Sequence, residues 1–146
     1  MSQTPGLVPV DAVAVALAES AKRPQVPAEE AAWLLVSAAA WLQRPGVWCR
    51  GEFALDERGE PADPLGPEAR RYDAGGALVF LGQHTVPARD LAWAVLTRLA
   101  YQRTGAPMAV ANDDPRMDAS RVAALMQAAA VALREVARQR QARRAA

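Results

Sequence analysis

The sequence of 146 residues has one cysteine, one histidine, one lysine (Lys22) and no isoleucine. A lone cysteine, Cys49, excludes an internal disulfide and a thiolate metal cluster within the chain. One thiol without a bridge suits a reducing compartment, so we expect a cytoplasmic protein. Aromatic residues make up only 5% of the chain. The core must therefore be built mainly from small aliphatic side chains.

Long apolar runs are also missing. The most apolar stretch, residues 31–42, has eleven apolar residues in twelve, whereas a membrane span needs about 20. The apolar residues 13–18 are not preceded by the basic region of a signal peptide, because the first basic residue is Lys22. We expect neither a membrane segment nor export.

Neither sign of charge dominates, since the formal net charge is +1. This balance argues against a dedicated nucleic-acid binder with a broad basic surface. Residues 117–146 nevertheless carry six positive and two negative groups. Basic residues at a helix end stabilise its dipole and aid solubility, and without aromatic neighbours they bind nucleic acid only weakly. The candidate nucleic-acid contacts are Arg134, Arg138, Arg140, Arg143 and Arg144.

Alanine is abundant, with 34 copies in a chain that is 51% apolar. Because alanine is the best helix former, we predict a mainly α fold. Periodicity and breakers place helices at residues 11–21, 27–44, 68–81, 88–102 and 118–137. We expect residues 1–146 to form a single helical domain, with an irregular lead-in at 1–9 and a basic helix end or frayed tail at 138–146.

The second predicted helix, residues 27–44, is apolar on nearly all sides, so we expect it to be central and to bury Trp33 and Trp41. The third contains Gly75 and Gly76 in its middle, which we interpret as a site of close helix–helix approach. The last has its apolar face at i, i+3 and i+4 spacing, with Asp118 or Ser120 as the N-cap.

A two-residue alternation replaces the helical period at residues 47–55. With a turn at 56–59 and a return strand at 60–63, it predicts a small β-hairpin inserted between helices two and three. The alternation directs Val47, Cys49 and Phe53 inward. It directs Trp48, Arg50 and Glu52 outward, where we expect them to contact another protein.

Few residues could carry chemistry, and we expect no cofactor and no metal. His84 lies in a linker without a second histidine to complete a site. Cys49 lies on the inward phase, where cysteine behaves as a small hydrophobe. The cluster Asn112, Asp113 and Asp114 could bind a divalent ion, but it also fits a structural turn leading to a helix cap. We prefer the structural interpretation.

The order of short motifs resembles a family of small uncharacterised proteins, a domain of unknown function found in actinobacteria and phages. The motifs are Val-Trp-Cys-Arg-Gly at 47–51, a charged turn at 56–61, Gly-Ala-Leu at 76–78 and Asn-Asp at 112–113. The resemblance covers residues 31–137. It implies a fold and supplies no mechanism.

Together these observations predict a non-enzymatic, cytoplasmic module that regulates or contacts another protein. The alternative is a weak nucleic-acid binder that uses the C-terminal arginines. An enzyme is the least favoured interpretation, because paired groups converging in a cleft are not evident. The sequence leaves the oligomeric state open.

Overall fold

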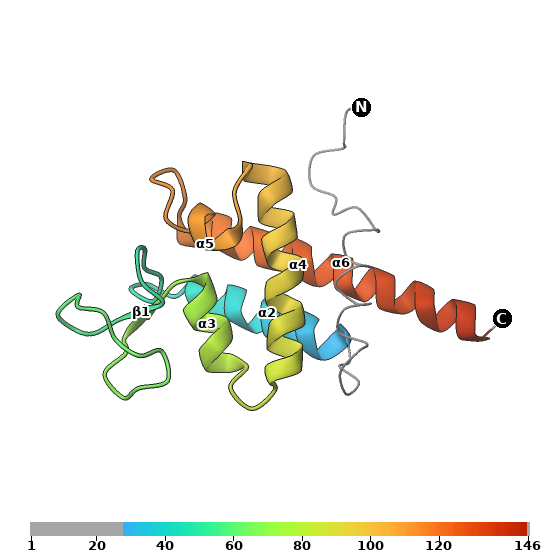
Figure 1. Ribbon diagram of the computed structural model, residues 1–146, viewed down its shortest axis with the longest axis horizontal. Coiled ribbons are helices and arrows are strands. Elements are labelled where there is room, and N and C mark those ends of the chain that lie inside the picture. The colour runs from blue at the N-terminus through green and yellow to red at the C-terminus, as the bar shows by residue number, and fades with distance from the viewer. Residues whose placement is uncertain (1–27, 146) are drawn as a thin grey trace.

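A computed structural model describes residues 28–145. Within this range the order of elements is α2 (Ala28–Leu42), β1 (Ala54–Leu55), β2 (Arg71–Tyr72), α3 (Ala74–Leu81), α4 (Val86–Thr104), α5 (Met108–Ala111) and α6 (Ala119–Ala145). The mainly helical class, with a small antiparallel strand pair inserted between helices, is confirmed (Figure 1). The predicted lead-in at 1–9 and helix at 11–21 lie outside the described residues.

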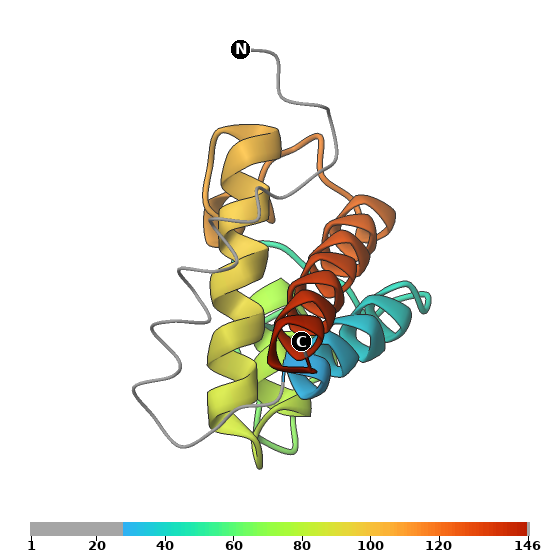
Figure 2. The ribbon, with the colours of Figure 1, turned by 90° about the vertical axis from the view of Figure 1, so that its right-hand side faces the viewer.

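The helices form two layers. α2 and α6 lie side by side and run in opposite directions, and α4 crosses them on the other side of the core (Figures 1 and 2). The most extensive helix contact is between α2 and α6. Fully buried leucine, methionine and valine side chains fill the space between the layers. Buried alanines on α2 and α6, such as Ala38 and Ala129, allow these two helices to approach closely.

α2 is central as predicted, because it contacts α3, α4 and α6, but the prediction that it buries Trp33 is wrong. Its inner positions are fully enclosed, but Trp33 is 60% exposed and Val36 is 38% exposed. The alanine and leucine side chains on the inner face of α2 make its contacts with α3, α4 and α6, and Trp33 lies on the opposite face. Trp41 does contact the core. The centre of its ring lies 4.4 Å from the ring centre of Tyr72 and 5.3 Å from that of Phe80.

The strand partner also differs from the prediction. β1 pairs with β2, and Ala54 stands opposite Tyr72. Residues 60–63 form only an isolated bridge, Leu55 with Pro61. Pro61 has no N–H to donate to a ladder. Ala62 N–H still donates to the Ala54 carbonyl at 3.0 Å on that side, and the pairing with β2 adds Arg70 N–H to the Leu55 carbonyl at 2.8 Å.

α3 begins at Ala74, six residues later than predicted, because Asp73 is its N-cap. The Asp73 side chain accepts the Gly76 N–H at 2.7 Å. Both glycines therefore lie in the first turn. A Cβ at Gly76 would lie 1.8 Å from the carbonyl oxygen of Phe53. The close approach is to the segment leading into β1 rather than to another helix.

The predicted helices at 88–102 and 118–137 correspond to α4 and α6. Asp118 acts as the expected cap, since its side chain accepts the Arg121 N–H at 2.8 Å. The short α5 was not predicted. Val136 is the last buried residue of α6, and the helix continues beyond it to Ala145. Within residues 28–145, no helix has the length and apolar character needed to cross a membrane.

Candidate functional site

Asn112 is the centre of a buried polar network. It follows α5 and is only 1% exposed. Its side-chain oxygen accepts the Trp48 indole N–H at 3.0 Å and the Ala74 backbone N–H at 3.1 Å. Its amide nitrogen donates to the Cys49 carbonyl at 3.1 Å. Because a buried amide is costly unless its polar atoms are paired, this network fixes the position of α5 against α3 and residues 47–53.

Arg50 joins the same two regions of the chain. Its guanidinium lies 4.7 Å from the centre of the Trp48 ring and donates to the Met117 carbonyl. The Gly51 N–H donates to the Asp113 carboxylate at 2.8 Å. We call residues 112–118 the α5–α6 loop. Residues 47–53 therefore hold this loop from one side.

These contacts correct the predicted outward surface of the hairpin. Trp48 is half-buried and hydrogen-bonded, while Phe53, predicted to face inward, is 56% exposed. Arg50 and Glu52 are exposed. The alternation fails because Gly51 has a φ of 85°. Such a turn interrupts the pleat that alternation requires.

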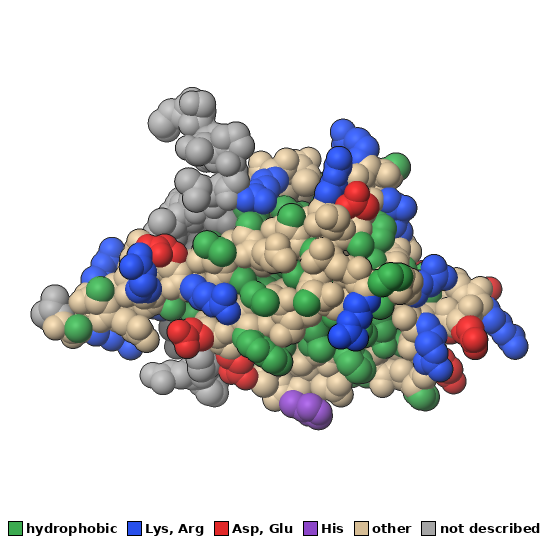
Figure 3. All heavy atoms as spheres, turned by 180° about the vertical axis from the view of Figure 1, so that it is seen from behind, with side chains coloured by type: hydrophobic (Ala, Val, Ile, Leu, Met, Phe, Trp, Pro, Cys, Tyr) green, Lys and Arg blue, Asp and Glu red, His purple; other side chains and the backbone are tan. Residues whose placement is uncertain are grey.

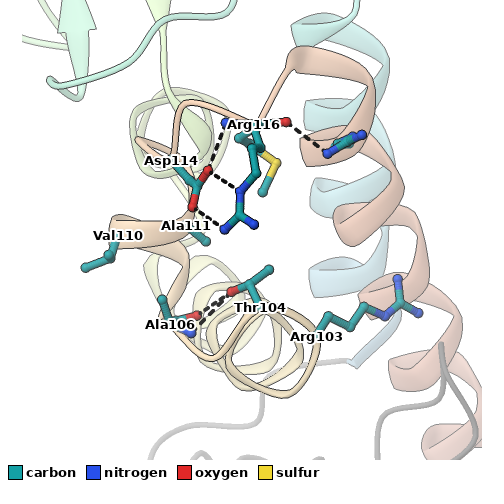
Figure 4. Close-up of a pocket in the computed structure, with 9 residues that line it drawn as sticks. Arg103, Thr104, Ala106, Val110, Ala111, Asp114 and Arg116 are labelled. Atoms are coloured by element: carbon teal, nitrogen blue, oxygen red, sulfur yellow. Dashed lines mark hydrogen bonds and ion pairs between the residues drawn. The ribbon is translucent and has the colours of Figure 1, made fainter.

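A pocket of about 280 Å³ opens where the end of α4, α5, the α5–α6 loop and the start of α6 meet (Figure 4). Gly105 caps the end of α4 with a φ of 80°, and Pro107 is the N-cap of α5, so the chain reverses around this pocket. The lining residues are Arg103, Thr104, Ala106, Val110, Ala111, Asp114, Arg116, Met117 and Arg121.

An ion pair lies at the exposed rim of the pocket. Arg116 donates through Nε to Oδ1 and through Nη2 to Oδ2 of Asp114, both at 3.1 Å. This two-pronged pair lowers the pKa of Asp114 to about 2, so its carboxylate is ionised at ordinary pH. Arg116 reaches across the pocket between Asp114 and Thr104 (Figure 4). A guanidinium has five N–H donors, so the pair leaves Arg116 with donors for a second acceptor.

Basic residues outnumber acidic ones among the described residues that line the pocket. They are Arg103, Arg116 and Arg121, and Asp114 is the acidic one. Arg121 is held at the rim by its bond to the Arg116 carbonyl at 3.0 Å. Val110, which is 60% exposed, and Met117 add apolar surface. The arrangement can receive an acidic group attached to a short apolar chain.

The other candidate residues do not meet in one place. His84 is exposed in the turn between α3 and α4. Cys49 is buried, and burial raises the pKa of its thiol to about 12, a value unsuited to a nucleophile. No three His, Cys, Asp or Glu side chains among residues 28–145 are grouped so that they could hold a metal ion.

Asp73 is a buried carboxyl that the sequence did not single out. It is 8% exposed. Burial raises its pKa to about 6, with a smaller contribution from the charge of Asp113, although the Gly76 N–H opposes the shift. As the cap of α3 it contributes to structure, and it does not line the pocket.

The C-terminal arginines form a separate basic region. Arg134, Arg138, Arg140, Arg143 and Arg144 are all exposed. Arg138 pairs with Glu135 at 2.7 Å. Four of the five follow Val136, where α6 has left the core, and basic side chains surround this projecting end (Figure 3).

Sequence reasoning missed the pocket because its three arginines are 103, 116 and 121 and come from three different elements. No periodic pattern connects them. The only signal was arginine content, sixteen of the seventeen basic residues. The charged turn at 112–114 was noticed, but its role in orienting Arg116 depends on tertiary contacts.

Comparison with known proteins finds a family whose model matches most of the chain. The model of DUF6197, a family of unknown function, matches residues 26–132. The match includes the Asn112 network and the whole pocket, and it excludes the five C-terminal arginines. No curated protein and no solved structure matches the chain.

Proposed function

Because the chain belongs to DUF6197, a family of unknown function, we propose its role from the pocket: a non-catalytic module that binds an acidic segment of another protein. The observation that carries the proposal is that Arg116 and Arg121 lie at one hollow, whose described lining includes one carboxylate, that of Asp114. Guanidinium groups bind carboxylates with two parallel hydrogen bonds, which gives direction as well as affinity.

The size of the pocket favours a side chain over a whole metabolite. Ligand pockets that enclose a small molecule span roughly 300–1,000 Å³, and this one has about 280 Å³. A glutamate or aspartate side chain with its backbone fits such a volume. The rest of the partner would contact the exposed Val110 at the rim.

The Asn112 network has a supporting role in this proposal. Arg116 lies on a loop, and a loop residue binds well only when its backbone is held in place. Trp48 and Arg50 anchor that loop through Asn112 and the Met117 carbonyl. They act as positioning residues rather than as the contact surface itself.

The test uses fluorescence anisotropy of a labelled hexaglutamate peptide, with hexaglutamine as the uncharged probe. We expect hexaglutamate alone to bind, with affinity falling as salt rises because the contacts are charged. Arg121→Gln is expected to weaken binding about tenfold, in line with the loss of one charge-assisted pair. Arg98→Gln removes an exposed arginine of α4 outside the pocket and is the matched control.

A substitution at Asp114 provides a second test of whether the ligand binds in the pocket. The Asp114 carboxylate accepts hydrogen bonds from Nε and Nη2 of Arg116, so an incoming carboxylate competes with it for these N–H groups. Asp114→Asn retains an oxygen that can accept the Arg116 backbone N–H, while the negative charge is removed. We expect this variant to bind hexaglutamate more tightly. Equal binding by wild type, Arg121→Gln and Asp114→Asn would contradict the proposal.

A second candidate function is weak nucleic-acid binding by the end of α6. It is favoured by the position of four arginines beyond Val136, which is the last buried residue of the described part of the helix. Truncation after Ala137 should abolish binding of a short labelled DNA duplex at low salt and leave the helical spectrum intact. If the truncation, and not Arg121→Gln, also abolishes hexaglutamate binding, the basic end is the acidic-ligand site.

A further inference from the structure

The outer face of α2 has an unusual exposed stripe. Positions 29, 33, 36 and 40 recur at helical spacing and are all exposed, whereas Leu34, Leu35 and Leu42 of the same helix are at most 2% exposed. A tryptophan that is 60% exposed on an otherwise well-packed helix is typical of an interface anchor. Figure 3 views the molecule from the side opposite α4, and hydrophobic side chains emerge across the middle of that face.

The ends of the stripe carry opposite charges. Glu29 lies in the first turn of α2 and is exposed. Arg44 is exposed two residues after the end of α2, in a turn where its N–H donates to the Trp41 carbonyl at 3.1 Å and so keeps it beside the end of the helix. Neither residue forms an ion pair among residues 28–145 within 4.0 Å. The apolar residues of the stripe lie between these two charges.

The stripe is complementary to itself when reversed. Around the midpoint between Val36 and Ser37, Glu29 and Arg44 are each seven and a half positions away, and Trp33 and Ala40 are each three and a half positions away. Two antiparallel copies of α2 would therefore place each Glu29 opposite the partner's Arg44. Each large Trp33 would meet the partner's small Ala40. Each contact would occur twice, as a two-fold axis requires.

We propose that this chain pairs with a second copy of itself through α2, antiparallel, with the two-fold axis between Val36 and Ser37. The occupant of the stripe is a second copy because one reversal satisfies both the charges and the side-chain sizes. A single helix pair buries less surface than a standard stable interface. The dimer is accordingly weak, with a dissociation constant on the order of 100 µM at low salt.

Sedimentation equilibrium of the full-length chain tests the pairing. The weight-average mass should rise from monomer toward dimer as the concentration reaches roughly 1 mM. Trp33→Ala should weaken association about tenfold or more, because it removes the central anchor twice. Tyr101→Ala is the matched control, since Tyr101 is equally exposed at 60% but lies on α4. Trp33→Gln provides a second truncation that keeps helix propensity.

Charge reversal tests the register. Glu29→Arg alone and Arg44→Glu alone should each weaken the dimer about threefold to tenfold at low salt, because like charges then face each other. The double variant should restore the affinity to within about threefold of the wild type. Circular dichroism of each variant verifies that the fold is retained. A chain that stays monomeric, a dimer insensitive to Trp33→Ala, or a double variant as weak as the single variants would overturn the proposal.

Discussion

Trp48 donates its indole N–H to the side-chain oxygen of Asn112 at 3.0 Å, across 64 positions of sequence. The bond joins the segment after α2 to the loop before α6. It also holds the loop that presents Arg116 to the pocket. A substitution at either end should therefore affect both the stability of the fold and the geometry of the proposed site.

Replacing Asn112 by alanine should be strongly destabilising. It leaves the N–H groups of Trp48 and Ala74 and the Cys49 carbonyl without their partner. We expect the free energy of unfolding to fall by about 2–5 kcal/mol, as measured by urea denaturation. Gln43→Ala removes an exposed amide and should change it by less than about 0.5 kcal/mol. A loss at Asn112 as small as that control would contradict the network.

Substitution by alanine should have very different effects on stability at the two adjacent glycines of α3. A Cβ at Gly76 would lie 1.8 Å from the Phe53 carbonyl oxygen, a backbone atom that cannot move alone. We expect Gly76→Ala to cost about 3 kcal/mol or more in the free energy of unfolding. At Gly75 the nearest atom is Cε1 of the exposed Phe53 ring, at 3.0 Å. Because that ring can turn aside and alanine favours helix, Gly75→Ala should remain within about 1 kcal/mol of the wild type. Equal effects at both positions would disprove this account of α3 packing.

Asp73 should make stability depend on pH in an unusual direction. Its pKa is raised from 3.8 to about 6, chiefly by burial, so the folded protein holds a proton that the unfolded chain has already released. The stabilisation is fully present below about pH 4 and is lost as the pH rises through about 6. The contribution is at most about 3 kcal/mol.

Asp73→Asn isolates this effect, because asparagine retains an oxygen that can cap α3. Urea denaturation of both proteins at several pH values between 4 and 7 gives the difference in unfolding free energy. The wild type should lose stability relative to the variant as the pH rises over this interval. Parallel curves would show that the Asp73 proton is bound equally in the folded and unfolded states.

Cys49 should react slowly with thiol reagents in the folded protein. It is 4% exposed, and burial raises the pKa of its thiol to about 12. At pH 8 the thiolate fraction is then about a thousandfold below that of an unperturbed cysteine. Reaction with a disulfide reagent such as DTNB should be at least that much slower in buffer than in denaturant. Comparable rates in the two conditions would contradict the burial of this thiol.

The sequence predicted those parts of the fold that depend on local pattern. Helix-favouring composition, the periodic face of α6 and its Asp118 cap are visible in a short window, and the structure has them. β1 pairs with residues 71–72 rather than with the nearer residues 60–63. A short sequence window does not distinguish between these two partners. The exposure of Trp33 depended on which elements cover α2, and hydrophobicity alone does not report that.

The candidate site was harder to predict for the same reason. Asn112 and Trp48 were both noticed, but no local rule joins a turn residue to an indole 64 positions away. Arg103, Arg116 and Arg121 become one group only after α4 has turned at Gly105 and α5 has reversed the chain. Buried networks and mixed-charge pockets of this kind are set by tertiary contacts.

The extensive contact between α2 and α6 also bears on how the chain folds during synthesis. A ribosome releases the N-terminal part first, so α2 emerges long before the helix that covers it. Until α6 has been made, the inner leucines of α2 have, among the described elements, only α3 and α4 as neighbours. Cooperative folding must therefore wait for the last quarter of the described chain, and nascent intermediates expose a long apolar helix. Such intermediates are prone to aggregation until α6 covers that helix.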